Sequence, residues 1–257
     1  MTDTYRALGF TFTIDGSEAS SLAELLAPLR SVSGGAGIRL TVDRPENVWH
    51  VLLDGSEKAS YRSLPRALTG AIWQMTQKAI ESRPDSLLLH AAAVVIDDRL
   101  VIVSGRSGAG KSTTAAALVD AGAHYLTDEV LVVDSTGRVV EWLPRPLGLD
   151  VTSIELLGGT SNRRAGPVER PVRPVDCWSG PLPDSCTIVL LDETGGPLEV
   201  TRPDRSAVVA RLIGETFPEA DTAQWGLDRI EMLTRDRRAV QIKGGTPTER
   251  VRAIRTK

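Results

Sequence analysis

The pattern of hydrophobic and polar positions divides the chain into two regions, residues 1–83 and residues 84–257. In the first region, three short segments alternate in polarity or are mainly apolar, as strands are. They are residues 10–14, 38–42 and 48–53. Because helical patterns stand between and after them, the first region is predicted to be a small α+β unit.

Two helices are predicted in this first region. Ser21 and Glu24 have the spacing of a capping box, which predicts that a short helix begins there. A longer helix is predicted after Ser63, with Pro65 in its first turn and apolar residues along one face. No cluster of catalytic residue types stands in this region, so we expect it to pack or to present a substrate.

The second region opens with two predicted hairpins. Residues 87–96 form a largely apolar strand, Asp97 and Asp98 a turn, and residues 99–103 a returning strand. After a predicted helix at residues 113–121, which Gly122 ends, residues 125–134 and 138–143 form a second pair. Strands paired as hairpins predict a mixed or antiparallel sheet, whereas ordinary nucleotide-binding α/β folds have parallel sheets.

The C-terminal part alternates strands and helices after a long irregular segment. Residues 158–185 are rich in Gly, Pro and Arg, which predicts a loop or a lid over a substrate. The elements predicted after it are strands at 187–191, 198–201 and 240–243, and helices beginning at Asp204, near Thr222 and at Thr246. Thr246 and Glu249 have the spacing of a capping box.

The strand at residues 100–103 leads into a glycine-rich loop, residues 105–112, which matches the phosphate-binding pattern G-x-x-x-x-G-K-[ST]. Its glycines permit a backbone whose amides turn toward phosphates, and the following helix directs its positive end there. Lys111 would contact the β and γ phosphates, and Ser112 would bind Mg²⁺. The residues expected to bind the nucleotide are Gly105, Arg106, Ser107, Gly108, Ala109, Gly110, Lys111, Ser112 and Thr113.

Three features together resemble HPr kinase/phosphorylase and its relatives with a PEP-carboxykinase-like nucleotide fold. They are the pair His90-Ala91 before the loop, the loop itself, and the pair Asp128-Glu129 after the loop helix. Those kinases have His-Ala or His-Gly at the first place and Asp-Asp at the third. The resemblance covers residues 87–150 well, and their Glu-Ile-Arg-Gly-type signature is absent. The chain is more similar to divergent members found with peptide-modifying enzymes, including kinases of lasso-peptide precursors.

The resemblance implies roles for single residues. Asp128 aligns with the catalytic aspartate, and independently of this a carboxylate there can orient an acceptor hydroxyl and take its proton. His90 and Lys111 complete the expected catalytic set, and Ser112, Asp128 and Glu129 the expected metal ligands. Arg145, between two prolines, is a candidate substrate contact because a guanidinium binds phosphate or carboxylate with two parallel bonds.

One segment supports a rival interpretation. Residues 188–191 are apolar and precede Asp192 and Glu193, as in the Mg²⁺-binding strand of ATPases. The turn at residues 194–196 and the alternation that follows it instead favour Asp192 as the end of a hairpin strand.

Composition limits the function classes. The net charge of −3 argues against bulk binding of nucleic acid, which requires a basic face. Cys177 and Cys186 have no metal-ligand or redox spacing. With no apolar run that could span a bilayer and no signal peptide in the sequence, we expect a cytoplasmic protein without membrane contact. The sequence leaves the oligomeric state open, a homo-oligomer included.

These observations predict an α+β fold in which a PEP-carboxykinase-like domain, with a mixed or antiparallel sheet, follows a small N-terminal unit. The predicted activity is transfer of the γ-phosphoryl group of ATP, with Mg²⁺, to a serine or threonine hydroxyl of a peptide or small protein. Two alternatives stay open. The acceptor could be a free amino acid such as serine, or the protein could be an ATPase or nucleotide-binding regulator that uses Asp192.

Overall fold

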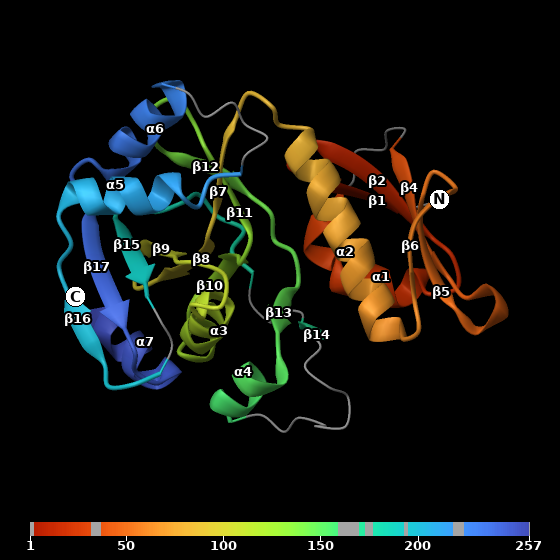
Figure 1. Ribbon diagram of the computed structural model, residues 1–257. Helices are drawn as coiled ribbons and strands as arrows, with labels where there is room; N and C mark the ends of the chain where they lie inside the picture. Colours follow the sequence, from red (N-terminus) through yellow and green to blue (C-terminus); the bar gives the residue numbers. More distant parts are fainter. Residues whose placement is uncertain are drawn as a thin grey trace. The chain divides into compact units, whose positions relative to one another are not determined.

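The computed structural model describes residues 3–31, 37–158, 170–172, 177–192, 195–217 and 224–256, and the chain divides into two compact units (Figure 1). The first contains Met1–Arg83, Arg145–Val151 and Asn162–Arg173, and the second contains the remainder. The hydrophobic pattern does not indicate that Arg145–Val151 joins the first unit. The structure has the mixed α+β composition that the sequence predicts.

The first unit is built on a six-stranded sheet of order β3-β1-β2-β4-β5-β6. All neighbouring strands are antiparallel except β2 and β4, which are parallel. The strands are β1 (Thr4–Ala7), β2 (Phe10–Asp15), β3 (Arg30–Ser31), β4 (Ile38–Asp43), β5 (Trp49–Leu53) and β6 (Ser56–Tyr61). The three predicted strands are confirmed. A separate antiparallel pair joins β13 (Leu147–Leu149) to β14 (Arg170–Val172).

In the described part of this unit the α-helices are α1 (Ala19–Leu25) and α2 (Leu64–Glu81), with 3₁₀ turns at Ala27–Leu29 and Pro45–Asn47. The prediction for α2 is confirmed, with Ser63 at its N-cap and Pro65 in its first turn. The expected capping box of α1 is wrong. That helix begins after Glu18, and the Ser21 hydroxyl donates to the Glu18 carboxylate at 2.8 Å instead of capping a helix end.

The second unit has a mixed six-stranded sheet of order β10-β8-β9-β15-β17-β16. Its centre, β9-β15-β17, is parallel, and the outer pairs are antiparallel. A three-stranded antiparallel sheet of order β12-β11-β7 adjoins it. The strands are β7 (Leu87–His90), β8 (Ala92–Ile96), β9 (Arg99–Ser104), β10 (His124–Thr127), β11 (Val130–Val133), β12 (Val139–Trp142), β15 (Cys186–Leu191), β16 (Glu199–Thr201) and β17 (Arg238–Lys243).

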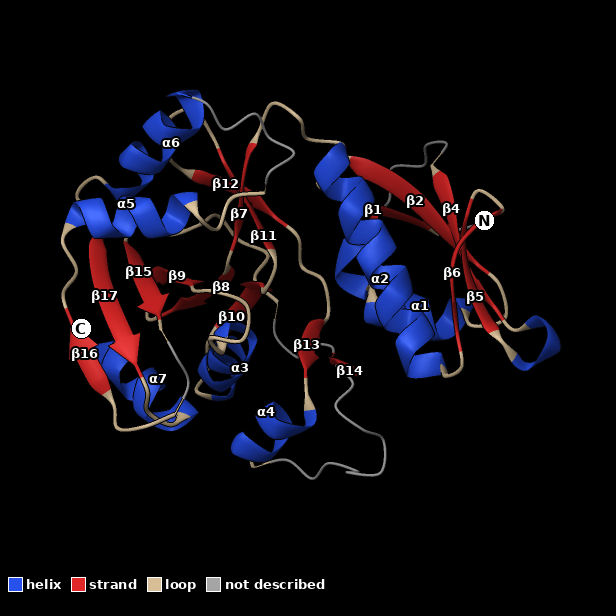
Figure 2. Cartoon of the chain, viewed as in Figure 1, coloured by secondary structure: helices blue, strands red, loops and turns tan. Residues whose placement is uncertain are grey.

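Helices lie on both faces of the larger sheet (Figure 2). α5 and α6 pack through Val208, Leu212, Ile230 and Leu233 into a core with alternate residues of β9 and β15. α3 and α7 pack against each other on the opposite face. The helices of this unit are α3 (Lys111–Asp120), α4 (Val151–Leu156, whose first residue belongs to the first unit), α5 (Arg205–Ile213), α6 (Gln224–Thr234) and α7 (Pro247–Thr256).

Both predicted hairpins are present, but each has an outer strand that breaks and changes sheet. Asp97 and Asp98, both with positive φ, turn β8 back into β9, and β11 turns back into β12. The expected single strand over residues 87–96 is wrong, because the chain breaks at Ala91. β7 therefore pairs with β11 in the smaller sheet, while β8 pairs with β9. The strand expected over residues 125–134 breaks in the same way at Asp128 and Glu129.

The expectation that Asp192 ends a hairpin strand is also wrong. β15 is parallel to both β9 and β17, and β16 pairs with β17 instead. The reason is that the chain after Asp192 crosses beyond β17 before it returns as β16. Asp192 therefore follows a strand whose carboxyl end lies at the same edge of the sheet as the end of β9.

Candidate active site

The glycine-rich loop, residues 105–112, connects β9 to α3, as the sequence predicts. Gly110 is the N-cap of α3 and has φ 89°, a conformation that residues with a Cβ rarely adopt. A Cβ on Gly105 would lie 2.7 Å from the carbonyl oxygen of Leu191, so only glycine allows β15 to approach this closely. Arg106, Ser107 and Gly108 are exposed, whereas Ala109 is buried. α3 ends at Asp120, and Gly122, the glycine expected to stop the helix, follows with φ 94°.

Lys111 lies in the first turn of α3 and is almost fully buried, with 7% exposure. Its Nζ donates to the carbonyl oxygen of Gly105 at 2.5 Å and lies 4.0 Å from Oε2 of Glu215. Burial lowers the pKa of Lys111, and the carboxylates of Glu215, Glu129 and Asp128 oppose this effect. The ammonium group is thus held at the loop by the Gly105 carbonyl oxygen and by nearby carboxylates.

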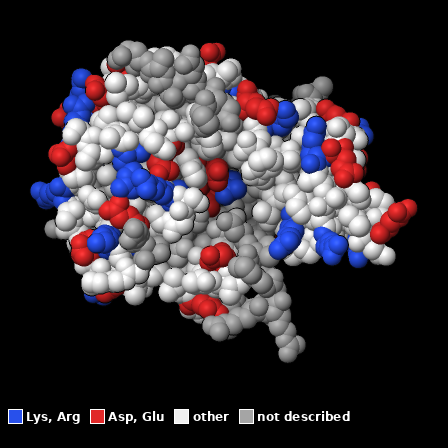
Figure 3. All heavy atoms as spheres, viewed as in Figure 1, with Lys and Arg blue, Asp and Glu red and all other residues white. Residues whose placement is uncertain are grey.

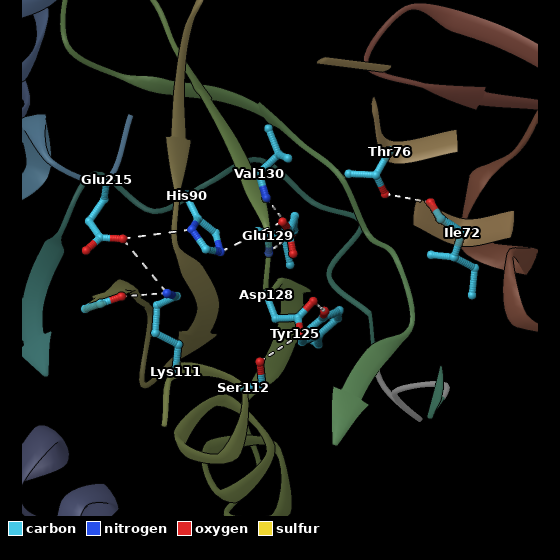
Figure 4. Close-up of polar contacts among 12 residues, drawn as sticks. Ile72, Thr76, His90, Lys111, Ser112, Tyr125, Asp128, Glu129, Val130 and Glu215 are labelled. Carbon is cyan, nitrogen blue, oxygen red and sulfur yellow. Dashed lines mark hydrogen bonds and ion pairs between the residues drawn. The ribbon is translucent and has the colours of Figure 1, made fainter. Parts of the chain in front are cut away.

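Ser112 and Asp128 are brought into direct contact (Figure 4). The Ser112 hydroxyl donates to Oδ2 of Asp128 at 3.0 Å, and the Tyr125 hydroxyl donates to Oδ1 at 3.1 Å. Asp128 is 2% exposed. Two hydroxyl groups therefore orient a buried carboxylate beside the start of α3.

His90, Glu129 and Glu215 form a second group beside Lys111 (Figure 4). His90 Nε2 lies 3.8 Å from Oε1 of Glu129, and Nδ1 lies 3.9 Å from Oε2 of Glu215. The exposed fractions of the three side chains are 32%, 21% and 8%. Because the same Glu215 oxygen approaches both His90 and Lys111, the histidine and the loop lysine share one acidic partner.

The two strand breaks explain how these residues meet. His90 pairs with Val130, and the Ala91 amide donates to the Glu129 carbonyl oxygen at 3.3 Å. On its other side, the His90 amide donates to the Glu215 carbonyl oxygen at 2.7 Å. The backbone at the break therefore holds one glutamate on each side of the histidine. The expectation that His90 lies on the strand directly beside the loop strand is wrong, since that strand is β8, but His90 does lie in this group.

Sequence reasoning missed two members of this site. Glu215 follows α5, far from the loop in sequence, and is positioned by a bridge between Leu89 and Thr216 that no motif marks. Tyr125 stands three residues before Asp128, but its side chain points at the carboxylate only because the strand bends after Thr127. No residue pattern indicates either contact.

Other expected residues have different surroundings. The Thr113 hydroxyl is 2.8 Å from the hydroxyl of Ser153 in α4. Arg145 belongs to the segment that joins the first unit, so its expected role as a substrate contact stays a prediction. Of the arginines expected in a lid, Arg163, Arg164 and Arg173 lie outside the described residues, and Arg170 is described only in its backbone.

Both carboxylate oxygens of Asp192 accept hydrogen bonds from side chains. Its Oδ1 accepts from Nη2 of Arg211 at 2.6 Å, and its Oδ2 accepts from Nε2 of Gln241 at 2.6 Å. Burial raises the pKa of Asp192, but the hydrogen bonds from Gln241 and Arg211 outweigh it and hold the pKa below its ordinary value. Glu193, the other residue of the rival interpretation, lies outside the described residues.

No family model matches the chain, and no curated protein is significantly similar to it. In the part of the chain that the structure describes, no helix has the length and apolar character needed to span a membrane. In the same part, no three His, Cys, Asp or Glu side chains gather as a metal site of their own.

Proposed function

We propose that the protein is a kinase that transfers the γ-phosphoryl group of ATP to a serine or threonine hydroxyl of a peptide or small protein. The observation that carries this proposal is the hydrogen bond between Ser112 of the glycine-rich loop and Asp128. It places a buried carboxylate beside the group expected at the phosphates, where a base for an acceptor hydroxyl is needed.

The chain's own residues account for both substrates of this reaction. The loop amides and Lys111 hold the triphosphate, for which the Lys111 ammonium leaves its bond to the Gly105 carbonyl oxygen. Asp128 orients the acceptor hydroxyl and takes its proton. A bond then forms between the acceptor oxygen and the γ-phosphorus, the bond from that phosphorus to the bridging oxygen breaks, and ADP leaves with the bond's electrons.

The oxygen atoms at the loop fit Mg²⁺. This ion prefers oxygen ligands and is usually bound through one or two carboxylates together with substrate phosphates. Ser112, Asp128 and Glu129 would hold it, and it would neutralise charge on the β and γ phosphates. Since Asp128 already contacts Ser112, a second assignment places Asp128 at the metal and Glu129, which is more exposed, at the acceptor.

Conservative amide variants distinguish these two assignments. In the variant that removes the metal ligand, transfer should need more Mg²⁺ and recover when Mg²⁺ is raised. In the variant that removes the base, transfer should stay low at saturating Mg²⁺ and lose its acidic limb in the pH profile. Asp128→Asn and Glu129→Gln are therefore compared by titrating Mg²⁺ at several pH values.

The resemblance to HPr kinase/phosphorylase supports the kinase proposal. His90 beside the loop, Asp128 against Ser112 and a mixed sheet around the loop are compatible with the PEP-carboxykinase-like fold that we propose for the second unit. The likeness to lasso-peptide precursor kinases favours a peptide acceptor. On the face drawn in Figure 3, basic and acidic side chains are interspersed, which gives no support to a nucleic-acid partner.

An ATPase that uses Asp192 is the second candidate. It is favoured by the position of Asp192 after β15, since β15 is parallel to β9 and adjacent to it. Against it, both carboxylate oxygens of Asp192 accept short hydrogen bonds from Arg211 and Gln241. A metal ion would have to displace a guanidinium that already neutralises the charge.

The experiment that tests the proposal follows the label of γ-labelled ATP with three acceptors. One reaction contains a pool of serine- and threonine-containing peptides, one contains free serine, and one contains water alone. Label in the peptides supports the proposal, and label in free serine replaces the acceptor with a metabolite. Release of label only as free phosphate, unchanged by either acceptor, contradicts the kinase and favours the ATPase.

A further inference from the structure

Arg250 is a buried guanidinium in the first turn of α7, and it contacts the glycine-rich loop. It is 4% exposed. Its Nη1 donates to the carbonyl oxygen of Ala109 at 3.3 Å and to the hydroxyl of Thr114 at 3.4 Å, and its Nε donates to the carbonyl oxygen of Gly244 at 2.8 Å. One side chain thus connects the loop, the first turns of α3 and the turn after β17.

The start of α7 fixes this position. The Glu249 carboxylate accepts from the amide and the hydroxyl of Thr246 at 2.8 and 2.9 Å, and the Glu249 amide donates back to the Thr246 hydroxyl at 3.3 Å. This is the capping box that the sequence predicts. Because β17 is parallel to β15 and β9, its carboxyl end delivers α7 to the same edge of the sheet as the loop.

Among the described residues, the Arg250 guanidinium donates hydrogen bonds only to neutral oxygen atoms. All three acceptors are carbonyl or hydroxyl oxygens, and among the described residues Arg250 forms no ion pair. Burial lowers the pKa of Arg250. A buried guanidinium without an anionic partner is costly in free energy. An anion that binds close to it would remove that cost.

We propose that Arg250 is a positioning residue that holds the glycine-rich loop through Ala109 and supplies the buried positive charge that a bound triphosphate neutralises. This inference rests on the proposed nucleotide binding. Lys111 has acidic neighbours, whereas the partners of Arg250 among the described residues are neutral oxygens, one of them in the loop itself. The contribution of Arg250 to affinity therefore grows with the number of phosphates in the ligand.

The test measures the dissociation constants of ATP, ADP and AMP for the full chain and its variants. Arg250→Met should weaken ATP binding by about ten- to a hundredfold, weaken ADP binding less and change AMP binding by less than about threefold. Arg250→Lys keeps the charge and should restore most of the ATP affinity. Arg252→Met removes an exposed arginine from the same helix and should bind all three nucleotides like the wild type.

Several results would overturn the inference. Equal losses for ATP, ADP and AMP in Arg250→Met would show a purely structural role, and unchanged ATP affinity would show none. If Arg250→Met does not fold, Arg250→Lys decides: ATP affinity within about threefold of wild type supports the charge, and a uniform tenfold loss for all three nucleotides contradicts it. If the wild-type protein binds nucleotide but transfers no phosphate, the proposed kinase activity is wrong. The binding measurements still test the role of Arg250 in that case.

Discussion

Two aspartates stand at strand ends near the glycine-rich loop, and their surroundings differ in kind. Asp128 is buried and accepts hydrogen bonds from two hydroxyl groups, those of Ser112 and Tyr125. Asp192 accepts from the guanidinium of Arg211 and the amide of Gln241. Neutral hydroxyl donors orient a carboxylate without offsetting its charge, so a cation can still bind there. A guanidinium has already neutralised the charge.

The comparison shows that a carboxylate cannot be identified as catalytic from its position at a sheet edge alone. By topology alone Asp192 is the better candidate for a metal ligand, because its strand is parallel and adjacent to the loop strand. The hydrogen-bond partners of the two carboxylates favour Asp128 instead. Asp128 acts electrostatically on Lys111 together with Glu129 and Glu215, whereas Asp192 forms an ion pair with Arg211.

The largest expected effect follows from Asp128→Asn. The amide is nearly isosteric but cannot take the acceptor proton, so transfer should fall by roughly 10²–10⁴ while ATP still binds. Initial rates of peptide phosphorylation and the ATP dissociation constant check this. Wild-type transfer by the variant would remove Asp128 from the mechanism.

Loss of the Lys111 charge should have the next largest effect. Lys111→Ala should lower the transfer rate by at least ~10², because a cation that stabilises the transferring phosphoryl group is missing. Both ATP affinity and single-turnover rate should be measured. Turnover like that of the wild type would contradict the assignment of the loop to phosphate binding.

Glu215→Gln should change the pH dependence of the site. The Glu215 carboxylate opposes the burial that lowers the pKa of Lys111, so its removal lowers that pKa further. Lys111 would then lose its proton at a lower pH, and the alkaline decline of ATP binding should move toward neutral pH. An unshifted decline would show that Glu215 does not act on Lys111.

The smallest effect on transfer is expected from Asp192→Asn, whose transfer rate should stay within about threefold of the wild-type rate. The substitution does remove the ion pair with Arg211. Stability should fall instead, by about 1–3 kcal/mol at neutral pH. Because the folded pKa of Asp192 lies below the ordinary 3.8, its contribution is present above about pH 4 and lost as the pH falls through the folded value. Urea unfolding at pH 7 and pH 3 measures the difference, which should shrink at the lower pH.

The sequence predicts the local elements of this chain better than its long-range pairing. Gly110, Lys111 and Ser112 are recognisable because the loop is one continuous segment with a strict backbone requirement. The breaks at Ala91 and Asp128 are not recognisable, since apolar residues continue on both sides and alternation cannot show a change of sheet. Glu215 enters the site through a non-local bridge, and Arg250 through a helix that begins at a predicted capping box but whose target no pattern specifies.

The central claim is that Asp128, and not Asp192, serves phosphoryl transfer to a hydroxyl. The most direct measurement gives γ-labelled ATP and a serine-containing peptide pool to the wild type, Asp128→Asn and Asp192→Asn, and separates labelled peptide from free phosphate. We predict labelled peptide with the wild type and Asp192→Asn, and almost none with Asp128→Asn. Free phosphate as the only labelled product, retained in Asp128→Asn and lost in Asp192→Asn, would contradict the account.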